Sequence, residues 1–126
     1  MSTWRFIGEN VVLAIHSQEI ARHGAADGLR DPAALEGALA RPRQLAAYGT
    51  PDAADVAAAY AFGIAKAHAF VDGNKRTAWV VSRLFLADNG RRLDFERAEA
   101  VEAMVGLAAG ALSESGFATW LRTRLR

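Results

Sequence analysis

The sequence predicts an all-α fold of about six helices. Alanine and leucine are frequent, and the strict alternation of apolar and polar residues that marks a strand is scarce. Glycines, prolines and capping residues recur where helices are expected to begin or end. With 126 residues, 52% of them hydrophobic, the chain is long enough to bury a hydrophobic core. We therefore expect residues 1–126 to form one helical domain.

The first two helices are predicted from spacing and start signals. Apolar residues at helical intervals indicate a helix over residues 8–22, which Gly24 is expected to end. The Asp31-Pro32 pair supplies an N-cap followed by proline at the first helical position. We expect this second helix to run only to about Ala40, because a proline at position 42 disfavours its continuation.

The third and fourth helices flank a break in the apolar pattern at residues 69–73. The Thr50-Pro51 pair repeats the proline start signal, and the helix that follows is expected to reach about His68. Asn74 is predicted to be the N-cap of a helix that ends at Gly90. The break between the two helices is therefore expected to be a helix–loop–helix junction.

The C-terminal part of the chain is predicted to add two more helices. Asp94 is expected to cap a helix that runs through Ala109, and Ser113 is expected to cap one that runs through Leu125. Three glycines in this region leave the boundaries of both helices open. At the other end of the chain, residues 4–7 are a candidate for a short strand.

The composition excludes several classes of protein. The absence of cysteine excludes a disulfide scaffold, a thiolate metal site and a cysteine nucleophile. No apolar run approaches the roughly 18 residues of a membrane span, and the start of the chain has no secretory signal pattern. The net charge of +1 argues against a protein that coats nucleic acid. We expect a cytoplasmic protein without direct nucleic-acid or membrane partners.

The densest group of chemistry-bearing side chains lies at residues 68–78, where six of eleven residues are ionisable or strongly hydrogen-bonding, in a chain otherwise rich in alanine and leucine. His68 is the residue type best suited to act as a base near neutral pH. Asp72 offers the hard oxygen ligand that magnesium prefers. Gly73 allows a tight turn and the close approach of a ligand, and the amides after it open a helix N-terminus, which favours phosphate.

Two cations complete this set. Lys75 and Arg76 supply positive charge for phosphate oxygens, and Lys75 is one of only two lysines, with Lys66, among fifteen basic residues. A base, a metal ligand, an anion cradle and two cations together indicate transfer of a phosphate-containing group. The alternative is a polar loop that caps two helices, with Asp72 and Arg76 as an ion pair. We expect Phe70 to point into the core.

The two remaining histidines are weaker candidates. His16 and His23 lie seven residues apart, so they fall on roughly one side of the first helix. A shared metal would need a third ligand, and the neighbouring sequence supplies none. We therefore expect both side chains to have solvated or capping roles.

The segment His68-x-Phe70-x-Asp72-Gly73-Asn74-Lys75-Arg76-Thr77-Ala78 resembles the signature of the Fic/Doc superfamily, and is most similar to the death-on-curing (Doc) toxins. The resemblance extends to residues 28–42 and 84–90, in order, and covers about residues 10–110. It implies an all-α fold with the loop and the following helix at its centre. It also implies a phosphotransferase that uses ATP and Mg²⁺. By position, the implied roles are proton acceptor for His68, magnesium ligand for Asp72, and phosphate binding for Lys66, Gly73, Asn74, Lys75 and Arg76.

Lys75 favours one reaction within the superfamily. Most members have a glycine at this position and transfer AMP to a target hydroxyl. Doc proteins have lysine there, and the resemblance implies that the nucleotide lies reversed and donates its γ-phosphate to a threonine of elongation factor Tu, which arrests translation. A Fic-type adenylyltransferase and a non-catalytic partner-binding module remain the alternatives.

The resemblance also implies a protein partner. The inhibitory helix motif of many Fic enzymes is missing, since the only Glu-Gly pair, Glu36-Gly37, has proline at the serine position. An enzyme of this kind without an internal inhibitor needs an external one. We expect a Phd-like antitoxin whose disordered C-terminal tail folds against the toxin, either over residues 101–120 or near the first helix.

Overall fold

The computed structural model describes residues 3–126, and in this part of the chain it contains six α-helices and no strand. Met1 and Ser2, the first residues of the N-terminal segment in which no secretory signal is expected, lie outside the described residues. The helices are α1 (Glu9–His23), α2 (Pro32–Tyr48), α3 (Ala53–Ala67), α4 (Asn74–Asp88), α5 (Arg97–Ala109) and α6 (Glu114–Arg122). The predicted all-α class is confirmed. Over the described residues, no helix is long and apolar enough to cross a membrane.

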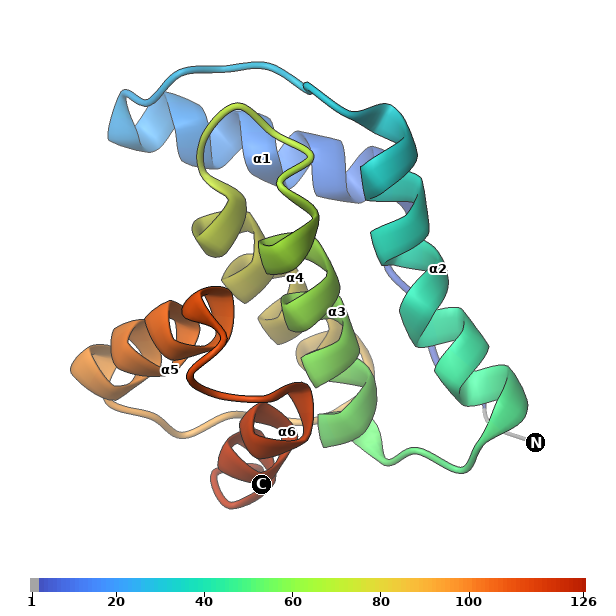
Figure 1. Ribbon diagram of the computed structural model, residues 1–126. Helices are drawn as coiled ribbons and strands as arrows, with labels where there is room; N and C mark the ends of the chain where they lie inside the picture. The colour runs from blue at the N-terminus through green and yellow to red at the C-terminus, as the bar shows by residue number, and fades with distance from the viewer. Residues whose placement is uncertain (1–2) are drawn as a thin grey trace.

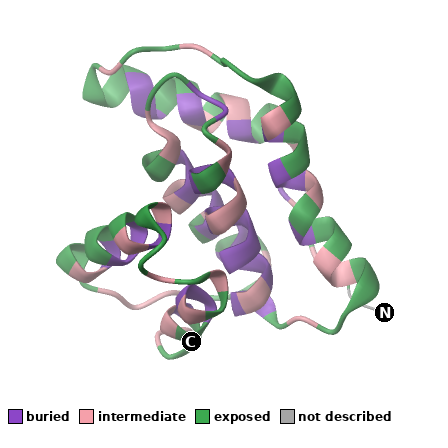
Figure 2. Cartoon of the chain, in the orientation of Figure 1, coloured by how far each residue is buried: buried purple, intermediate pink, exposed green. Residues whose placement is uncertain are grey.

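Helix α3 lies at the centre of the molecule and packs against α2, α4, α5 and α6 (Figure 1). Ten of its fifteen residues are buried, and most of these are alanines, so neighbouring helices approach it closely. Figure 2 shows the buried residues concentrated on α3 and on the facing sides of the helices around it. The loop from α3 to α4 lies between α1 and the connection that leads into α2 (Figure 1).

The predicted end of the second helix is wrong. Helix α2 does not stop before Pro42 but continues through this buried residue to Tyr48. A proline inside a helix costs roughly 3 kcal/mol. Good helix formers follow Pro42 as far as Tyr48, and the packing of α2 on α3 favours one continuous helix.

Two helix starts differ from their predicted positions. Helix α3 begins after Asp52 rather than Thr50, because the Asp52 carboxylate accepts from Asp55 N at 2.9 Å and the Asp55 carboxylate accepts from Asp52 N at 3.1 Å. This reciprocal capping box is a stronger start signal than the proline before it. At α4 the N-cap is Gly73, so the predicted cap Asn74 is the first helical residue.

The C-terminal helices are shorter than predicted because the segments beside them pair with each other. Asp94 N donates to Arg124 O at 2.9 Å, and Leu93 forms an isolated antiparallel bridge with Leu125. Because this pairing holds residues 93–94 and 124–125 outside the helices, Glu96 rather than Asp94 is the N-cap of α5, and α6 ends at Arg122. The predicted cap Ser113 is confirmed, and its hydroxyl accepts from Gly116 N at 3.0 Å.

The predicted strand at residues 4–7 does not form. This segment is bound by side chains instead of a neighbouring strand. Asn89 accepts from Arg5 N at 2.9 Å and donates to Arg5 O at 3.0 Å. The amide side chain thus satisfies the backbone that a strand partner would otherwise bind.

Candidate active site

The loop between α3 and α4 is held by a short backbone pairing with the segment that precedes α2. Ala69 O accepts from both Arg30 N and Asp31 N, at 2.7 and 2.9 Å, and Val71 N donates to Gly28 O at 3.0 Å. Leu29 and Phe70 form the antiparallel bridge between these segments. Residues distant in sequence therefore fix the backbone that carries the motif.

His68 begins this loop in a strained backbone conformation. It is the C-cap of α3 and, at φ 50°, the only non-glycine residue with positive φ among residues 3–126. Arg30 Nη2 donates to the His68 carbonyl at 2.7 Å, which holds the backbone in this conformation. The His68 residue is exposed, so its side chain is accessible to a substrate. Strained backbone of this kind clusters at functional sites.

Asn74 binds the loop itself. Its side-chain oxygen accepts from Phe70 N at 3.1 Å, and its side-chain nitrogen donates to Phe70 O at 3.0 Å. Phe70 is fully buried, as predicted. The Asn74 side chain thus closes the turn, and any phosphate contact from that side chain would have to replace these two bonds. The backbone amide of Asn74, in the first turn of α4, makes neither of these two bonds.

Asp72 presents an exposed carboxylate beside the start of α4. Its Oδ1 accepts from Gly73 N at 2.8 Å, and among residues 3–126 no ion pair joins it to Arg76, so the ion pair of the alternative interpretation is not formed. The described residues contain no cluster of three or more metal-ligating side chains. A single carboxylate fits magnesium, which retains several waters and takes one or two carboxylates together with substrate phosphates.

The N-terminus of α4 is open to an anion. Gly73 is its N-cap with φ 78°, in the left-handed region, and no side chain caps the helix. The first hydrogen bond of the helix runs from Thr77 N to Gly73 O at 3.0 Å, which leaves the amides of residues 74–76 without a partner within the helix. Lys75 and Arg76 are both exposed at this end. Free amides, the helix dipole and two cations all favour phosphate here.

Lys66 does not face the loop in this structure. Its ammonium donates to Ala108 O at 3.3 Å, at the C-terminal end of α5, and lies close to Gly110. A cation at this position interacts favourably with the negative end of the α5 dipole. The predicted phosphate contact of Lys66 would require this hydrogen bond to break.

The expectation for His16 is wrong. Its side chain is only 3% exposed, it stacks on the Phe70 ring, and its Nε2 lies 2.8 Å from Asp72 O. The sequence did contain a signal for this burial, since His16 lies four residues after Val12 and four before Ile20, on the buried side of α1. Nothing local indicated that the side chain would meet the loop. His23, in contrast, is exposed as expected.

Comparison with known proteins identifies the family. The Fic/DOC family model matches residues 6–86, which include the whole loop, all of α3 and α4 as far as Leu86. The chain belongs to the Fic/DOC family. It is also 36% identical over 119 residues to "Protein kinase doc" of Escherichia phage P1, an alignment that covers 94% of each chain. It is 46% identical over 78 residues to "Toxin Doc" of Mycolicibacterium smegmatis, which covers 56% of this chain and 59% of that one.

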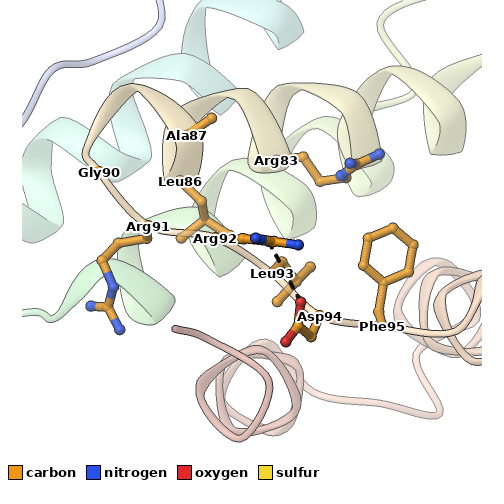
Figure 3. A pocket seen from close by; sticks show the side chains of 9 residues that line it. All are labelled: Arg83, Leu86, Ala87, Gly90, Arg91, Arg92, Leu93, Asp94 and Phe95. Carbon is orange, nitrogen blue, oxygen red and sulfur yellow. Dashed lines mark ion pairs between the residues drawn. The ribbon is translucent and has the colours of Figure 1, made fainter.

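A pocket at the opposite end of α4 is separate from the Fic/DOC motif. Three arginines, Arg83, Arg91 and Arg92, line it together with Asp94 and Phe95 (Figure 3). Arg83 lies over the Phe95 ring at 4.9 Å, and Arg92 pairs with Asp94 at 3.7 Å. Its lining begins at Arg83, nine residues after the start of α4, so the pocket begins about 14 Å along the helix from the loop. The pocket is mostly outside the family match and takes no part in the candidate site.

Proposed function

We propose that this protein is the toxin of a toxin–antitoxin pair, and that it phosphorylates a threonine of elongation factor Tu with ATP. Family membership and the names of its two relatives support a Doc-type activity. The observation that carries the proposal is the loop itself. It presents an exposed histidine, an exposed carboxylate and an uncapped helix N-terminus with two cations within nine residues of sequence. Lys75, in place of the glycine of most superfamily members, favours phosphoryl over adenylyl transfer.

The chemistry assigns one step to each group of the loop. His68 accepts the proton of the target hydroxyl, whose oxygen forms a bond to the γ-phosphorus. The bond from that phosphorus to the β,γ-bridging oxygen breaks, and ADP leaves with the electron pair. The amides at the start of α4, with Lys75 and Arg76, bind the phosphate oxygens and stabilise the charge that they carry. The phosphoryl group passes directly to the target hydroxyl, so no covalent enzyme intermediate forms and no enzyme nucleophile is needed.

Asp72 is the residue that would hold Mg²⁺. The metal, when bound, neutralises phosphate charge and orients the transferred group. Asp72 meets the chemical requirement because its carboxylate is exposed and its second oxygen is not needed for the turn. Asp72 would be the protein's ligand to the metal, and phosphate oxygens and water would be expected at the other positions.

The same proposal includes a partner and a location. An enzyme that stops translation acts in the cytoplasm and requires an inhibitor that binds it tightly. We assign that role to a Phd-like antitoxin whose disordered C-terminal tail folds on the toxin surface.

The test uses ATP labelled at either the γ or the α position, with purified elongation factor Tu. We expect label in elongation factor Tu from the γ position only. Transfer of the α label would instead identify an adenylyltransferase and overturn the proposal.

Substitution of the proposed base tests the residue assignment. His68→Ala is expected to lower the rate roughly 10²-fold or more, because it removes the proton acceptor. The matched control is His23→Ala, an exposed histidine on α1, which is expected to retain the wild-type rate. Equal rates for the two variants would contradict the role of His68. Growth arrest that survives both His68→Ala and Asp72→Asn would point to a non-catalytic binding module.

A further inference from the structure

His16 joins α1 to the backbone of the motif loop through a defined hydrogen bond. Its Nε2 lies 2.8 Å from the Asp72 carbonyl oxygen, 56 residues away in sequence. A carbonyl oxygen only accepts, so the imidazole carries a proton on Nε2 and donates it. The residue is 3% exposed, and a polar ring buried to this extent loses stability if its hydrogen bond is removed.

The same ring is packed against the loop on two sides. It stacks on the Phe70 ring, with 3.7 Å between centroids and 10° between planes. A Cβ at Gly73 would lie 3.7 Å from His16 Nε2 and 3.1 Å from Ile20 Cδ1, so α1 directly covers the turn into α4. His16 therefore stacks on the buried aromatic residue of the motif, hydrogen-bonds the carbonyl of Asp72 and lies beside the N-cap Gly73.

The second ring nitrogen of His16, Nδ1, connects to the backbone pairing that supports the loop. His16 Nδ1 lies 3.8 Å from Asp27 Oδ1, and that oxygen accepts from Gly28 N at 2.8 Å. Gly28 O in turn accepts from Val71 N at 3.0 Å. His16 is thus linked to Asp72 directly, and to the neighbouring Val71 through Asp27 and Gly28.

From these contacts we infer that His16 is a positioning residue for the proposed phosphotransfer, one that orients Asp72 and the first amides of α4 by holding the Asp72 carbonyl. The inference rests on the proposed function. Rotation of the peptide after Asp72 would move its carboxylate and the Gly73 amide together. Without the hydrogen bond, the loop retains its composition and charge but samples more orientations, so binding of ATP with Mg²⁺ weakens.

The first test does not depend on activity. His16→Phe preserves the aromatic stack and removes the donor, His16→Gln retains a side-chain N–H of similar reach, and His23→Phe is the matched control on the same helix. We expect amide hydrogen exchange at Val71 and Gly73 to rise about tenfold in His16→Phe and to change little in the other two. Exchange in His16→Phe that equals that of His23→Phe at both amides would overturn the inference.

The second test measures the consequence for catalysis. Phosphorylation rates are recorded against Mg²⁺ concentration at fixed ATP. His16→Phe is expected to raise the half-saturating Mg²⁺ concentration about tenfold and to recover most of its rate at high Mg²⁺, while His16→Gln stays within about threefold of wild type. An unchanged Mg²⁺ requirement in His16→Phe, with melting as in the wild type, would contradict the inference.

The two tests separate the inference from the proposed function. If the wild-type protein transfers no γ-phosphate but His16→Phe still loosens the loop amides, the proposed function fails and the positioning of the loop stands. Where His16→Phe does not fold, the same two readouts on His16→Gln decide. In that case, amide exchange in the loop and a Mg²⁺ requirement near the wild-type values in His16→Gln would support the role of the His16 N–H donor. A change of about tenfold in both quantities, with unaltered melting, would contradict that role.

Discussion

At the scale of single residues, Tyr60 shows how one buried hydroxyl holds a whole segment. It belongs to α3 and is fully buried. Its hydroxyl accepts from Ile7 N at 2.8 Å and donates to Ile7 O at 3.3 Å, so it satisfies the backbone of the segment that leads into α1. Burial raises the pKa of the Tyr60 phenol above its usual value, which keeps it protonated and able to donate.

Removal of this hydroxyl is expected to destabilise the protein. Tyr60→Phe leaves the N–H and C=O of Ile7 without a partner, at a cost of about 1–3 kcal/mol. Urea unfolding measures the change, and the slope of the free energy against urea is expected to stay the same. The control is Tyr48→Phe, where the side chain is 91% exposed and the change is expected to stay within about 0.5 kcal/mol. An equally small effect at both positions would contradict this account.

At the scale of elements, α2 and α3 approach each other through a glycine. A Cβ at Gly63 would lie 3.1 Å from Ala38 O and 3.4 Å from Ala38 Cα, both on the backbone of α2. Pro42, four residues after Ala38, has no N–H to donate to that carbonyl. The close contact and the proline inside α2 therefore occur at one place in the structure.

This contact predicts opposite effects for two Gly→Ala substitutions. Alanine favours a helix over glycine by about 1 kcal/mol, and at Gly37, with open space around its Cα, we expect that gain in full. At Gly63 the added methyl group has to displace the α2 backbone, at a cost of about 1–3 kcal/mol that outweighs the gain. The melting temperature is expected to rise for Gly37→Ala and fall for Gly63→Ala. A rise for both would show that the interface relaxes freely.

At the scale of the whole molecule, ion pairs join helices that are far apart in the sequence. Arg122 of α6 donates to Asp52 at 2.7 Å and to Asp55 at 2.8 Å, both at the start of α3. Arg41 of α2 pairs with Glu114 of α6 at 2.6 Å. Helix α6 is thus attached to both α2 and α3. Because these pairs are partly exposed, each is expected to contribute less than about 1 kcal/mol.

The Asp52 pair predicts a defined dependence on pH. Hydrogen bonds from Arg122 are the main cause that lowers the pKa of Asp52 from 3.8 to about 2. A carboxylate with a lowered pKa stabilises the fold above its ordinary pKa, and this stabilisation is lost as the pH falls toward the folded value. We therefore expect Arg122→Gln to be less stable than wild type at pH 6, by less than about 1 kcal/mol, and the difference to shrink between pH 4 and pH 2.

Unfolding by urea at each pH measures this difference, and salt supplies the control. At about 1 M NaCl the difference at pH 6 is expected to shrink as well, because the exposed charges are screened. A difference that stays constant from pH 6 to pH 2 would show that Arg122 acts through packing and not through its charge.

The amino-acid sequence by itself determined the helical class, the order of the helices and the family. These depend on local signals, namely helical spacing, the caps Asp31 and Ser113, and a contiguous motif. The residues of the motif were also visible, because they are consecutive along the chain. Their roles in catalysis remain predictions that the experiments above address.

Only the tertiary structure decided how the loop is supported. It also decided that α2 continues through Pro42, where the helix packs on α3. Two further contacts join residues that are separated in sequence, namely Lys66 with α5 and His16 with Asp72. Intrinsic preferences act over a few residues, whereas these contacts form only when the helices pack and bury their partners. The sequence therefore indicated which groups belong to the candidate site, and the fold decided which side chains hold the loop in place.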